Sequence, residues 1–292
     1  MIRKTIIGCG YLGQRVAGEL QQSGEQVVGV VRSVISAEAL KTAGITPMLL
    51  DLDQPLPDTF STADLPLQGS ELFYFAPPPS SGVSETRVRN LIRLFETLGH
   101  PWRVVYLSTT GVYGDCQGRW VDETHAVDPV VERARRRWDA EQVFREWRAR
   151  SGGSLVVLRV AGIYGPGKLP LERIEKGLPM VRESEAPFTN RIHVDDLVQV
   201  CMAAMARGGD GEIYNVSDGR PGTMTDYFNR VADRAGLPRP AQISLADGEQ
   251  QLSAGMMSYM RESRRLRNDK MLSELGITLI HPDLAHGLEA SF

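Results

Sequence analysis

The sequence is poor in cysteine and histidine, the residues that most often hold metals or disulfides. Cys9, Cys116 and Cys201 lie far apart among the 292 residues, and no two of them have a C-x-x-C spacing. Cysteines so far apart favour neither a zinc knuckle nor a disulfide framework, so we expect a protein of a reducing compartment, the cytoplasm. The five histidines are scattered along the chain. We therefore expect no metal site.

Long apolar runs and a strong charge of one sign are also missing. No stretch reaches the roughly 18 apolar residues that a membrane span needs. The first apolar run is interrupted by Gly8 and Gly10, which makes it too short for a signal peptide. The formal net charge is −3. This balance gives no electrostatic reason to bind nucleic acid or an anionic membrane, and a small molecule is the expected partner.

Short apolar segments alternate with segments of helical periodicity over the first half of the chain. The apolar segments predict strands at 4–7, 26–31, 47–50, 71–75, 103–107 and 155–160. The helical periodicity predicts helices at 11–23, 36–43, 84–98 and 131–149. This alternation is typical of an α/β fold, here a Rossmann-type doubly wound parallel sheet with a smaller C-terminal lobe.

The first predicted strand runs directly into a glycine turn and then into a helix. The turn reads Gly8-Cys9-Gly10-Tyr11-Leu12-Gly13. In such a turn the first glycine permits the tight bend, the second lets the backbone approach a pyrophosphate, and the third allows close helix packing. The phosphates then lie on the helix N-terminus. The sequence therefore predicts that residues 8–13 bind a dinucleotide, although glycine turns also serve purely structural corners.

The second predicted strand ends in Arg32-Ser33. An enzyme that prefers NAD usually presents an acidic side chain here to the ribose 2′-hydroxyl. A guanidinium pairs instead with a 2′-phosphate, and the Ser33 hydroxyl can add a hydrogen bond. We therefore expect NADP(H) to be favoured, with NAD(H) still possible. The alternative is a solvated arginine at a strand end.

Several further stretches resemble one family when they are read together with the glycine turn. They are Asp51-Leu52, residues 107–115 (LSTTGVYGD), 158–167 (LRVAGIYGPG), 191–196 (RIHVDD) and 213–219 (IYNVSDG). In their order and spacing the chain resembles the extended short-chain dehydrogenase/reductases, the group that contains NAD-dependent epimerases and dehydratases. The resemblance covers nearly the whole length. It implies an enzyme that is an NAD(P)-dependent oxidoreductase, epimerase or dehydratase.

The resemblance also assigns a domain organisation and a cofactor site. We expect residues 1–163, with 189–216 returning to them, to bind the dinucleotide, and residues 164–188 and 217–292 to form the smaller substrate-binding lobe. Besides the glycine turn, the resemblance implies that the cofactor borders Asp51, Leu52, Ala76, Pro77, Pro78 and Ile163. Helices 84–98 and 131–149 pair across subunits in many relatives, so a homodimer through them is expected.

Thr109 falls where the family places its catalytic Ser or Thr. A hydroxyl there can hydrogen-bond a substrate oxygen whose charge changes during hydride transfer, which stabilises the transition state. The alternative is a threonine that caps the turn at the end of a strand.

The family's catalytic Tyr-x-x-x-Lys pair has no counterpart in this chain. Its two positions fall on Arg133 and Arg137, and no tyrosine occurs between Gly114 and Tyr164. Arginine keeps its proton at neutral pH and cannot act as a base there. Arg137 can still hold a ribose or phosphate. Alternatively, Arg133, Arg135, Arg136 and Arg137 form the solvated or subunit-facing side of a helix that buries Val131, Ala134, Trp138 and Val143.

Two other tyrosines can replace the missing proton donor. Tyr113 follows Thr109 by four residues, and Tyr164 follows the sixth predicted strand. Both positions are commonly Tyr in the family for reasons of packing, so their presence alone is weak evidence. The missing pair also motivates a different hypothesis, a non-catalytic NADP(H)-binding sensor or regulatory protein.

The expected substrate is small and either sugar-like or anionic. Tyr164 and Lys168 would border it, and Lys168 would project from a glycine-rich turn. Arg264 belongs to a cluster with Arg261, Arg265 and Arg267, which resembles the stretch that holds diphosphate in nucleotide-sugar enzymes. With Glu262 and Asp269 as helical partners, the same cluster can equally be a surface network.

The segment 190–196 places His193 next to two carboxylates in the sequence. We expect Asp195 to act as the N-cap of the following helix rather than to converge with His193 on a metal ion. The remaining histidines, His100, His125, His281 and His286, suggest no set of ligands.

Overall fold

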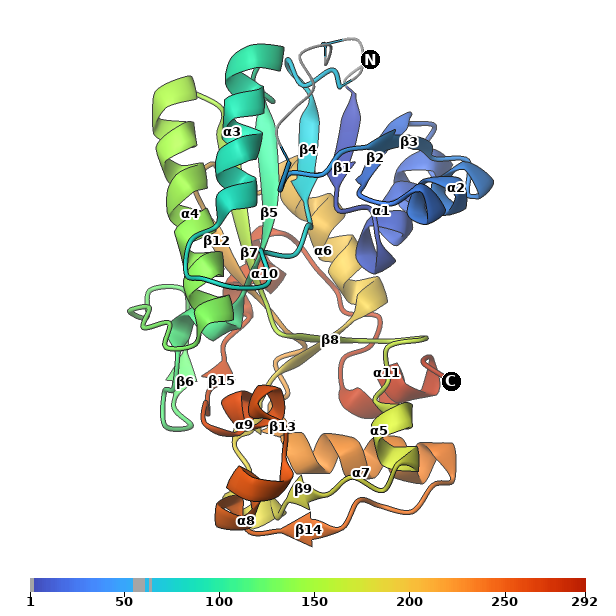
Figure 1. The fold of residues 1–292 in the computed structure, drawn as a ribbon, viewed down its shortest axis with the longest axis vertical. Coiled ribbons are helices and arrows are strands. Elements are labelled where there is room, and N and C mark those ends of the chain that lie inside the picture. Colours follow the sequence, from blue (N-terminus) through green and yellow to red (C-terminus); the bar gives the residue numbers. More distant parts are fainter. Residues whose placement is uncertain (1–2, 55–60, 63–64) are drawn as a thin grey trace. The chain divides into compact units, whose positions relative to one another are not determined.

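Seven strands form one sheet in the computed structural model, which describes residues 3–54, 61–62 and 65–292. The strand order is β12-β7-β5-β4-β1-β2-β3 (Figure 1). The strands are β1 (Lys4–Ile7), β2 (Val27–Val31), β3 (Thr46–Leu49), β4 (Glu71–Tyr74), β5 (Arg103–Thr109), β7 (Ser154–Val160) and β12 (Ile213–Val216). The pairs β1–β2, β2–β3, β1–β4 and β4–β5 are all parallel. The predicted α/β, doubly wound parallel sheet is confirmed, and its order reverses between β1 and β4, where such folds bind ligands.

The helices that connect these strands lie where the periodicity predicts them. They are α1 (Tyr11–Gln22), α2 (Val34–Thr42), α3 (Thr86–Leu98) and α4 (Glu132–Ser151), followed by α6 (Val194–Arg207). Each of the first four begins and ends within two residues of its predicted range. α2 begins earlier than predicted because the Ser33 hydroxyl accepts a hydrogen bond from the Ser36 N–H, which makes Ser33 the N-cap.

The main core lies between the sheet and the helices α3 and α4, which Figure 1 shows in front of the strands. Aromatic side chains are prominent in it. The rings of Tyr74, Tyr106 and Phe144 contact one another with centroids 5.1–5.9 Å apart. Packing of aromatic side chains therefore fixes α4 against the strands β4 and β5, whose carboxyl ends carry candidate site residues.

Short strands and helices make up much of the remaining chain. The strands are β6 (Trp120–Val121), β8 (Gly162–Tyr164), β9 (Met180–Val181), β10 (Phe188–Thr189), β11 (Arg191–His193), β13 (Gly222–Thr223), β14 (Gln242–Ile243) and β15 (Arg265–Leu266). They form the pairs β6–β15, β8–β11, β9–β14 and β10–β13. The helices are α5 (Leu171–Glu175), α7 (Met224–Ala235), α8 (Leu245–Gln251), α9 (Ala254–Met260), α10 (Asp269–Glu274) and α11 (Leu284–Glu289). A second core gathers around Tyr227, Phe228 and Val231 of α7.

The chain divides into two compact units whose limits differ from the predicted domains. Unit 1 comprises residues 1–112, 132–159 and 198–214, and unit 2 comprises 113–131, 160–197 and 215–292. The main difference is the segment 113–131, which we expected in the sheet domain. It belongs to unit 2 because β6 pairs with β15, a contact between distant parts of the sequence that no local pattern reveals.

None of the helices in the described part of the chain is both long enough and apolar enough to cross a bilayer.

Candidate functional site

The glycine turn after β1 has the geometry that a dinucleotide site requires. Gly8 adopts φ +85°, and its N–H donates to the Val30 carbonyl of the neighbouring strand at 3.0 Å. A Cβ atom at Gly8 would lie only 2.4 Å from the backbone nitrogen of Ala76. Only glycine fits, because both the backbone conformation and the space exclude a side chain.

Gly10 and Gly13 meet different requirements. A Cβ at Gly10 would meet nothing within 4 Å, so the backbone here is open to a ligand. A Cβ at Gly13 would come within 3.1 Å of the Gly8 carbonyl and of the Ile6 side chain, which shows how closely α1 packs on the turn. Gly10 supplies no side-chain cap to α1. The N-terminal turn of α1 is therefore suited to an anion.

A cavity of about 360 Å³ opens beside this turn. It is lined by Ile7, Gly8, Cys9, Gly10, Val30, Val31, Arg32, Ser33, Ser36, Leu50, Leu52, Ala76, Pro77 and Arg87. The floor is apolar and comes from strands and the segments just after them, while the polar groups come from the end of β2, the start of α2 and Arg87 of α3. An apolar floor with a few polar groups suits a nucleoside with a charged substituent.

Two residues of the turn contribute packing. Cys9 lines the cavity as a buried residue, and burial raises the pKa of its thiol to about 12, so it remains a neutral thiol at physiological pH. Leu12 is buried in α1. Tyr11 begins the helix, and the Arg15 guanidinium lies 4.0 Å from the centre of its ring.

Arg32 and Ser33 lie on the cavity as the NADP(H) prediction requires. The Arg32 side chain is 62 % exposed, and its ion pair with Asp53 spans 3.8 Å. The Ser33 hydroxyl also donates to the Ser36 hydroxyl at 2.8 Å while capping α2. The polar wall of the cavity thus combines a guanidinium, two hydroxyls and a helix N-terminus.

An ion pair that the sequence did not reveal holds the loops around the cavity. Arg87, buried in the first turn of α3, binds the Asp53 carboxylate through two guanidinium nitrogens, one at 2.8 Å. It also donates to the carbonyls of Pro77 at 2.7 Å and Pro78 at 3.3 Å. The hydrogen bond from Arg87 lowers the pKa of Asp53. No local motif marks this pair, because its partners are 34 residues apart in the chain.

The residues 51–52 and 76–78, expected to border the cofactor, divide into two groups. Leu52, Ala76 and Pro77 line the cavity. Asp51 instead accepts a hydrogen bond from the Asp53 N–H at 3.0 Å, and Pro78 offers its carbonyl to Arg87. Asp51 and Pro78 therefore shape the loops that carry the lining residues.

Thr109 ends β5 and also caps the turn that follows. Its hydroxyl oxygen accepts a hydrogen bond from the Gly111 N–H at 3.1 Å, as the structural alternative expects. Accepting this bond leaves the hydroxyl able to donate a bond of its own. The geometry is therefore compatible with either role.

The residue before Thr109 belongs to a buried ionic network. Ser108 donates to Glu141 at 2.6 Å, and Arg159 donates to the two oxygens of the same carboxylate at 3.2 and 2.8 Å. Glu141 is completely buried and Arg159 nearly so. This network connects α4 to β5 and β7 directly behind the end of β5.

Arg137 lies at the carboxyl ends of β4 and β5. Its guanidinium donates to the Leu107 carbonyl at 2.9 Å and to the Ala76 carbonyl at 3.4 Å. It is half-buried, so the interpretation of a fully solvated arginine does not describe it. Arg137 places a fixed positive charge beside the strand ends.

Arg136 is a clear exception to the expected solvated face of α4. It is buried, and its guanidinium donates to the Gly82 carbonyl. The same nitrogen also donates to the Glu132 carboxylate at 3.4 Å. Arg135 is exposed as expected, and Trp138, expected on the buried face, is only half-buried. The loop around Gly82 covers this part of the helix, which the periodicity of α4 alone could not show.

Glu85 is a buried acid near this cluster. Burial raises the pKa of its carboxyl to about 7, although the Arg137 charge and the backbone N–H groups of Val88 and Arg87 oppose the shift. One of its carboxylate oxygens is buried without a hydrogen-bond partner. Glu85 is therefore poised to change protonation near neutral pH.

Tyr113 belongs to unit 2 and is fully buried. Its hydroxyl donates to the Asn215 side chain at 2.8 Å, and its ring meets the edge of His125. This geometry favours the packing role over proton donation. The nearby Cys116 thiol lies 3.9 Å from His125, and burial raises its pKa.

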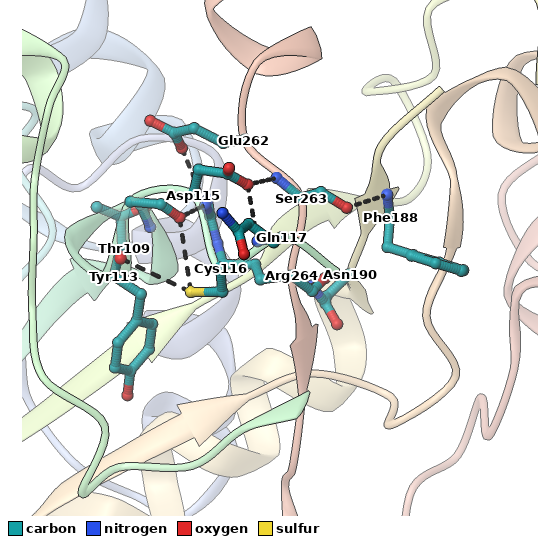
Figure 2. A network of polar contacts seen from close by, with 12 residues as sticks. Thr109, Tyr113, Asp115, Cys116, Gln117, Phe188, Asn190, Glu262, Ser263 and Arg264 are labelled. Atoms are coloured by element: carbon teal, nitrogen blue, oxygen red, sulfur yellow. Dashed lines mark hydrogen bonds and ion pairs between the residues drawn. The ribbon is translucent and has the colours of Figure 1, made fainter. Parts of the chain in front are cut away.

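Arg264 is part of a polar network in unit 2 (Figure 2). Its guanidinium donates to the Gly114 carbonyl at 2.6 Å and to Glu262 at 2.9 Å. The Asp115 carboxylate accepts the Ser263 N–H at 2.9 Å. These contacts join the loop after β5 to the segment before β15, so the geometry favours the structural alternative for Arg264 over a substrate contact.

The remaining predicted residues follow β7. Ile163 lies in β8 and pairs with Ile192 of β11. Tyr164 is buried, and burial raises the pKa of its hydroxyl well above the usual value. Lys168 is exposed in a turn closed by a hydrogen bond from its N–H to the Gly165 carbonyl.

The segment 190–196 differs from the prediction in two ways. α6 begins at Val194, so Asp195 lies in its first turn and is not its N-cap. His193 and Asp195 do converge: His193 Nδ1 lies 3.5 Å from Asp195 Oδ2, and His281 Nε2 lies 3.6 Å from the same oxygen. The sequence did not require this convergence, which arises because β11 leads directly into the helix and the distant segment 280–281 packs beside it.

Comparisons with known proteins show similarity over nearly the whole chain. Residues 82–217 match the model of the NAD dependent epimerase/dehydratase family, and residues 5–51 match that of ketopantoate reductase PanE/ApbA. Protein YeeZ of Escherichia coli (strain K12) is 26 % identical over 288 residues, with 97 % of each chain covered.

One human relative and one solved structure are more similar in sequence. Short-chain dehydrogenase/reductase family 42E member 1 of Homo sapiens is 30 % identical over 271 residues, which cover 80 % of this chain and 67 % of the relative. The structure of a functionally unknown conserved protein from Silicibacter pomeroyi DSS is 32 % identical, with a TM-score of 0.82 and 99 % and 98 % of the two chains covered.

Proposed function

Because the chain belongs to the NAD-dependent epimerase/dehydratase family of the extended short-chain dehydrogenase/reductases, we propose that it is an enzyme that uses NADP(H) in preference to NAD(H). Its substrate would be a small sugar-like or anionic molecule. The observation that carries the cofactor preference is Arg32, whose exposed guanidinium lines the cavity at the end of β2.

The surroundings of Arg32 support a 2′-phosphate at this place. Asp53 is its nearest acidic partner, but Arg87 already binds both oxygens of that carboxylate. Arg32 can therefore turn to a phosphate dianion and pair with it in a forked geometry. The hydroxyls of Ser33 and Ser36 and the N-terminus of α2 would add donors and a favourable dipole.

Calorimetric titration of the full chain with NADPH and with NADH tests this preference. Hydrogen bonds to a charged group are worth about 1.5–3 kcal/mol, so NADPH should bind about ten- to a hundredfold more tightly. Arg32→Asp should remove the difference, whereas Arg93→Asp, an exposed arginine of α3, should leave it intact. Equal affinities of the unmutated chain for the two cofactors would refute the proposal.

The proposed chemistry assigns roles to residues beyond the cofactor cavity. The bound nicotinamide would supply or accept a hydride. Thr109 would orient the reacting oxygen, Ile163 would lie against the nicotinamide, and Tyr113, Tyr164 or a bound water would supply the proton. Among these, Tyr113 has the weakest support, because its hydroxyl is buried and donates to Asn215.

A second candidate function is a sensor or regulatory protein that binds NADP(H) without catalysis. The geometry of Arg137 favours it, since this residue stands at the family's lysine position and directs its donors to main-chain carbonyls. Incubation with deuterated NADPH and a panel of carbonyl compounds separates the two candidates. Transfer of deuterium to any compound supports the enzyme; binding of NADPH with no transfer across the panel supports the sensor.

The substrate and the assembly belong to the same proposal. Lys168 is exposed and can contact an anionic group, whereas the contacts of Arg264 support a structural role.

We place the protein in the cytoplasm, as a homodimer formed through α3 and α4. These two helices lie against each other, and Arg89 of α3 is paired with Asp139 of α4. A monomer in light scattering would refute the dimer.

A further inference from the structure

Two imidazoles and a carboxylate meet at the start of α6 in unit 2. Asp195 Oδ2 lies 3.5 Å from His193 Nδ1 and 3.6 Å from His281 Nε2. One potential ligand atom from each of the three residues lies within 4.8 Å of the others. The two imidazole rings are also in contact, with centroids 4.0 Å apart and planes tilted by 57°. These three residues are not in the cofactor cavity and have no role in the proposed reaction.

The fold holds these side chains in place through main-chain contacts. The buried carboxylate of Asp196 accepts the N–H groups of Ile280 at 2.6 Å and His281 at 3.1 Å. This contact fixes the segment 280–281 against the first turn of α6. Asp196 thereby positions His281 toward Asp195, although the two residues come from distant parts of the chain.

The hydrogen bonds also show which nitrogen of His193 can act as a ligand. Its Nδ1 lies on the side of the Asp195 carboxylate and accepts the Asp195 N–H at 3.3 Å. The Nδ1 atom and the carboxylate oxygen, 3.5 Å apart, can both act as ligands of a cation between them. The hydrogen bond from the Asp195 N–H is long, so an ion can replace it at Nδ1 with little loss.

We propose that His193 Nδ1, Asp195 Oδ2 and His281 Nε2 bind one divalent ion of the zinc class. Imidazole nitrogen and carboxylate oxygen are ligands of Zn²⁺ at about 2.0–2.2 Å, which places ligand atoms of a tetrahedral site about 3.3–3.6 Å apart. The two separations from Asp195 Oδ2, 3.5 and 3.6 Å, fall within this range. The ion would connect the first turn of α6 to the segment that leads into α11.

The site would keep one coordination position for water or a ligand. Three protein ligands are typical of zinc sites with an open fourth position. The Asp195 side chain is about half exposed, whereas His193 is fully buried, so the open position would face solvent on the side of Asp195. The ion therefore needs no separate entry path.

The test uses the full chain, freed of metal with EDTA and then dialysed. We expect one equivalent of Co²⁺ to give the intense visible absorption of a tetrahedral ion, and Zn²⁺ to displace it and to raise the melting temperature. His281→Gln and Asp195→Asn should each weaken Zn²⁺ binding at least tenfold. The control is His286→Gln, an exposed histidine whose side chain pairs with Asp283 outside the cluster.

The cobalt spectrum of the unmutated chain decides the matter even where a variant does not fold. A spectrum of the hydrated ion at about 100 μM protein and metal, a concentration at which a site of this class is filled, overturns the site. Zn²⁺ binding that His281→Gln and Asp195→Asn leave unchanged also overturns it. None of these measurements depends on NADP(H), so the metal site and the proposed function can fail separately.

Discussion

The two glycines that begin the cofactor turn should respond in opposite ways to the same substitution. In Gly8→Ala the new Cβ would lie 2.4 Å from the Ala76 nitrogen, on a residue with φ +85°. The left-handed backbone costs about 1–2 kcal/mol for an alanine. Relief of the overlap costs about 1–3 kcal/mol more, because both partners are backbone. We expect a total of about 2–5 kcal/mol, a large part of an ordinary protein's stability.

Gly10→Ala adds the same methyl group two residues later without a collision. Its Cβ would meet nothing within 4 Å, so the free energy of unfolding should change by less than about 0.5 kcal/mol. The methyl group would instead stand where the backbone should approach the pyrophosphate. NADPH affinity should therefore fall at least tenfold, or about 1.4 kcal/mol.

Urea denaturation and NADPH calorimetry on the same preparations measure both effects. Gly8→Ala should lower the urea midpoint and the melting temperature, the latter by at least about 4 °C. Gly10→Ala should leave the urea midpoint and the melting temperature unchanged and should bind NADPH more weakly. If Gly8→Ala were as stable as the unmutated chain, the close approach of the turn to Ala76 would be wrong. If Gly10→Ala bound NADPH normally, the turn would not hold the pyrophosphate.

Two buried acids give further predictions. Glu141→Gln should destabilise the protein by about 3–5 kcal/mol in urea denaturation, because it leaves Arg159 buried without its counter-charge, and adding Arg159→Met should recover part of the loss. Additive losses would contradict this coupling. Burial raises the pKa of Glu85 from 4.5 to about 7, so the folded state keeps a proton that the unfolded chain releases, and stability should fall as pH rises from about 4.5 to about 7. Glu85→Gln should flatten this decline; an unchanged pH profile would contradict it.

The sheet and its connecting helices could be predicted because their signals are local. β1, the glycine turn and α1 follow one another within the first 22 residues. The strand and the helix are each marked by the spacing of their apolar residues, and the turn is marked by its glycines. The position of Arg32 beside the cavity could be predicted in the same way, because β2 lies next to β1 and its carboxyl end therefore lies beside the glycine turn.

Contacts between distant side chains could not be predicted in the same way. The Asp53–Arg87 pair depends on how two loops meet, and α4 gave no sign that Arg136 is buried beneath the loop at Gly82. The convergence of His193 with His281 requires the chain to return to the start of α6, where Asp196 contacts Ile280, 84 residues further along the chain. Such residues look like ordinary surface charges in the sequence, because each has its partner in another element.

The position of Arg137 limits how the protein can move a proton. Arginine stays charged at any physiological pH, and two carbonyls at the ends of β4 and β5 already accept its hydrogen bonds. It can stabilise negative charge at the strand ends, but it cannot exchange a proton there. The buried acid Glu85, whose pKa Arg137 influences, does titrate near neutral pH, yet it is shielded from solvent. Proton transfer in a catalytic cycle would therefore have to come from a substrate group, water or a residue of unit 2. Hydride exchange that persists in Tyr164→Phe would exclude Tyr164 as the donor, and exchange that also persists in Tyr113→Phe would leave the substrate group and water.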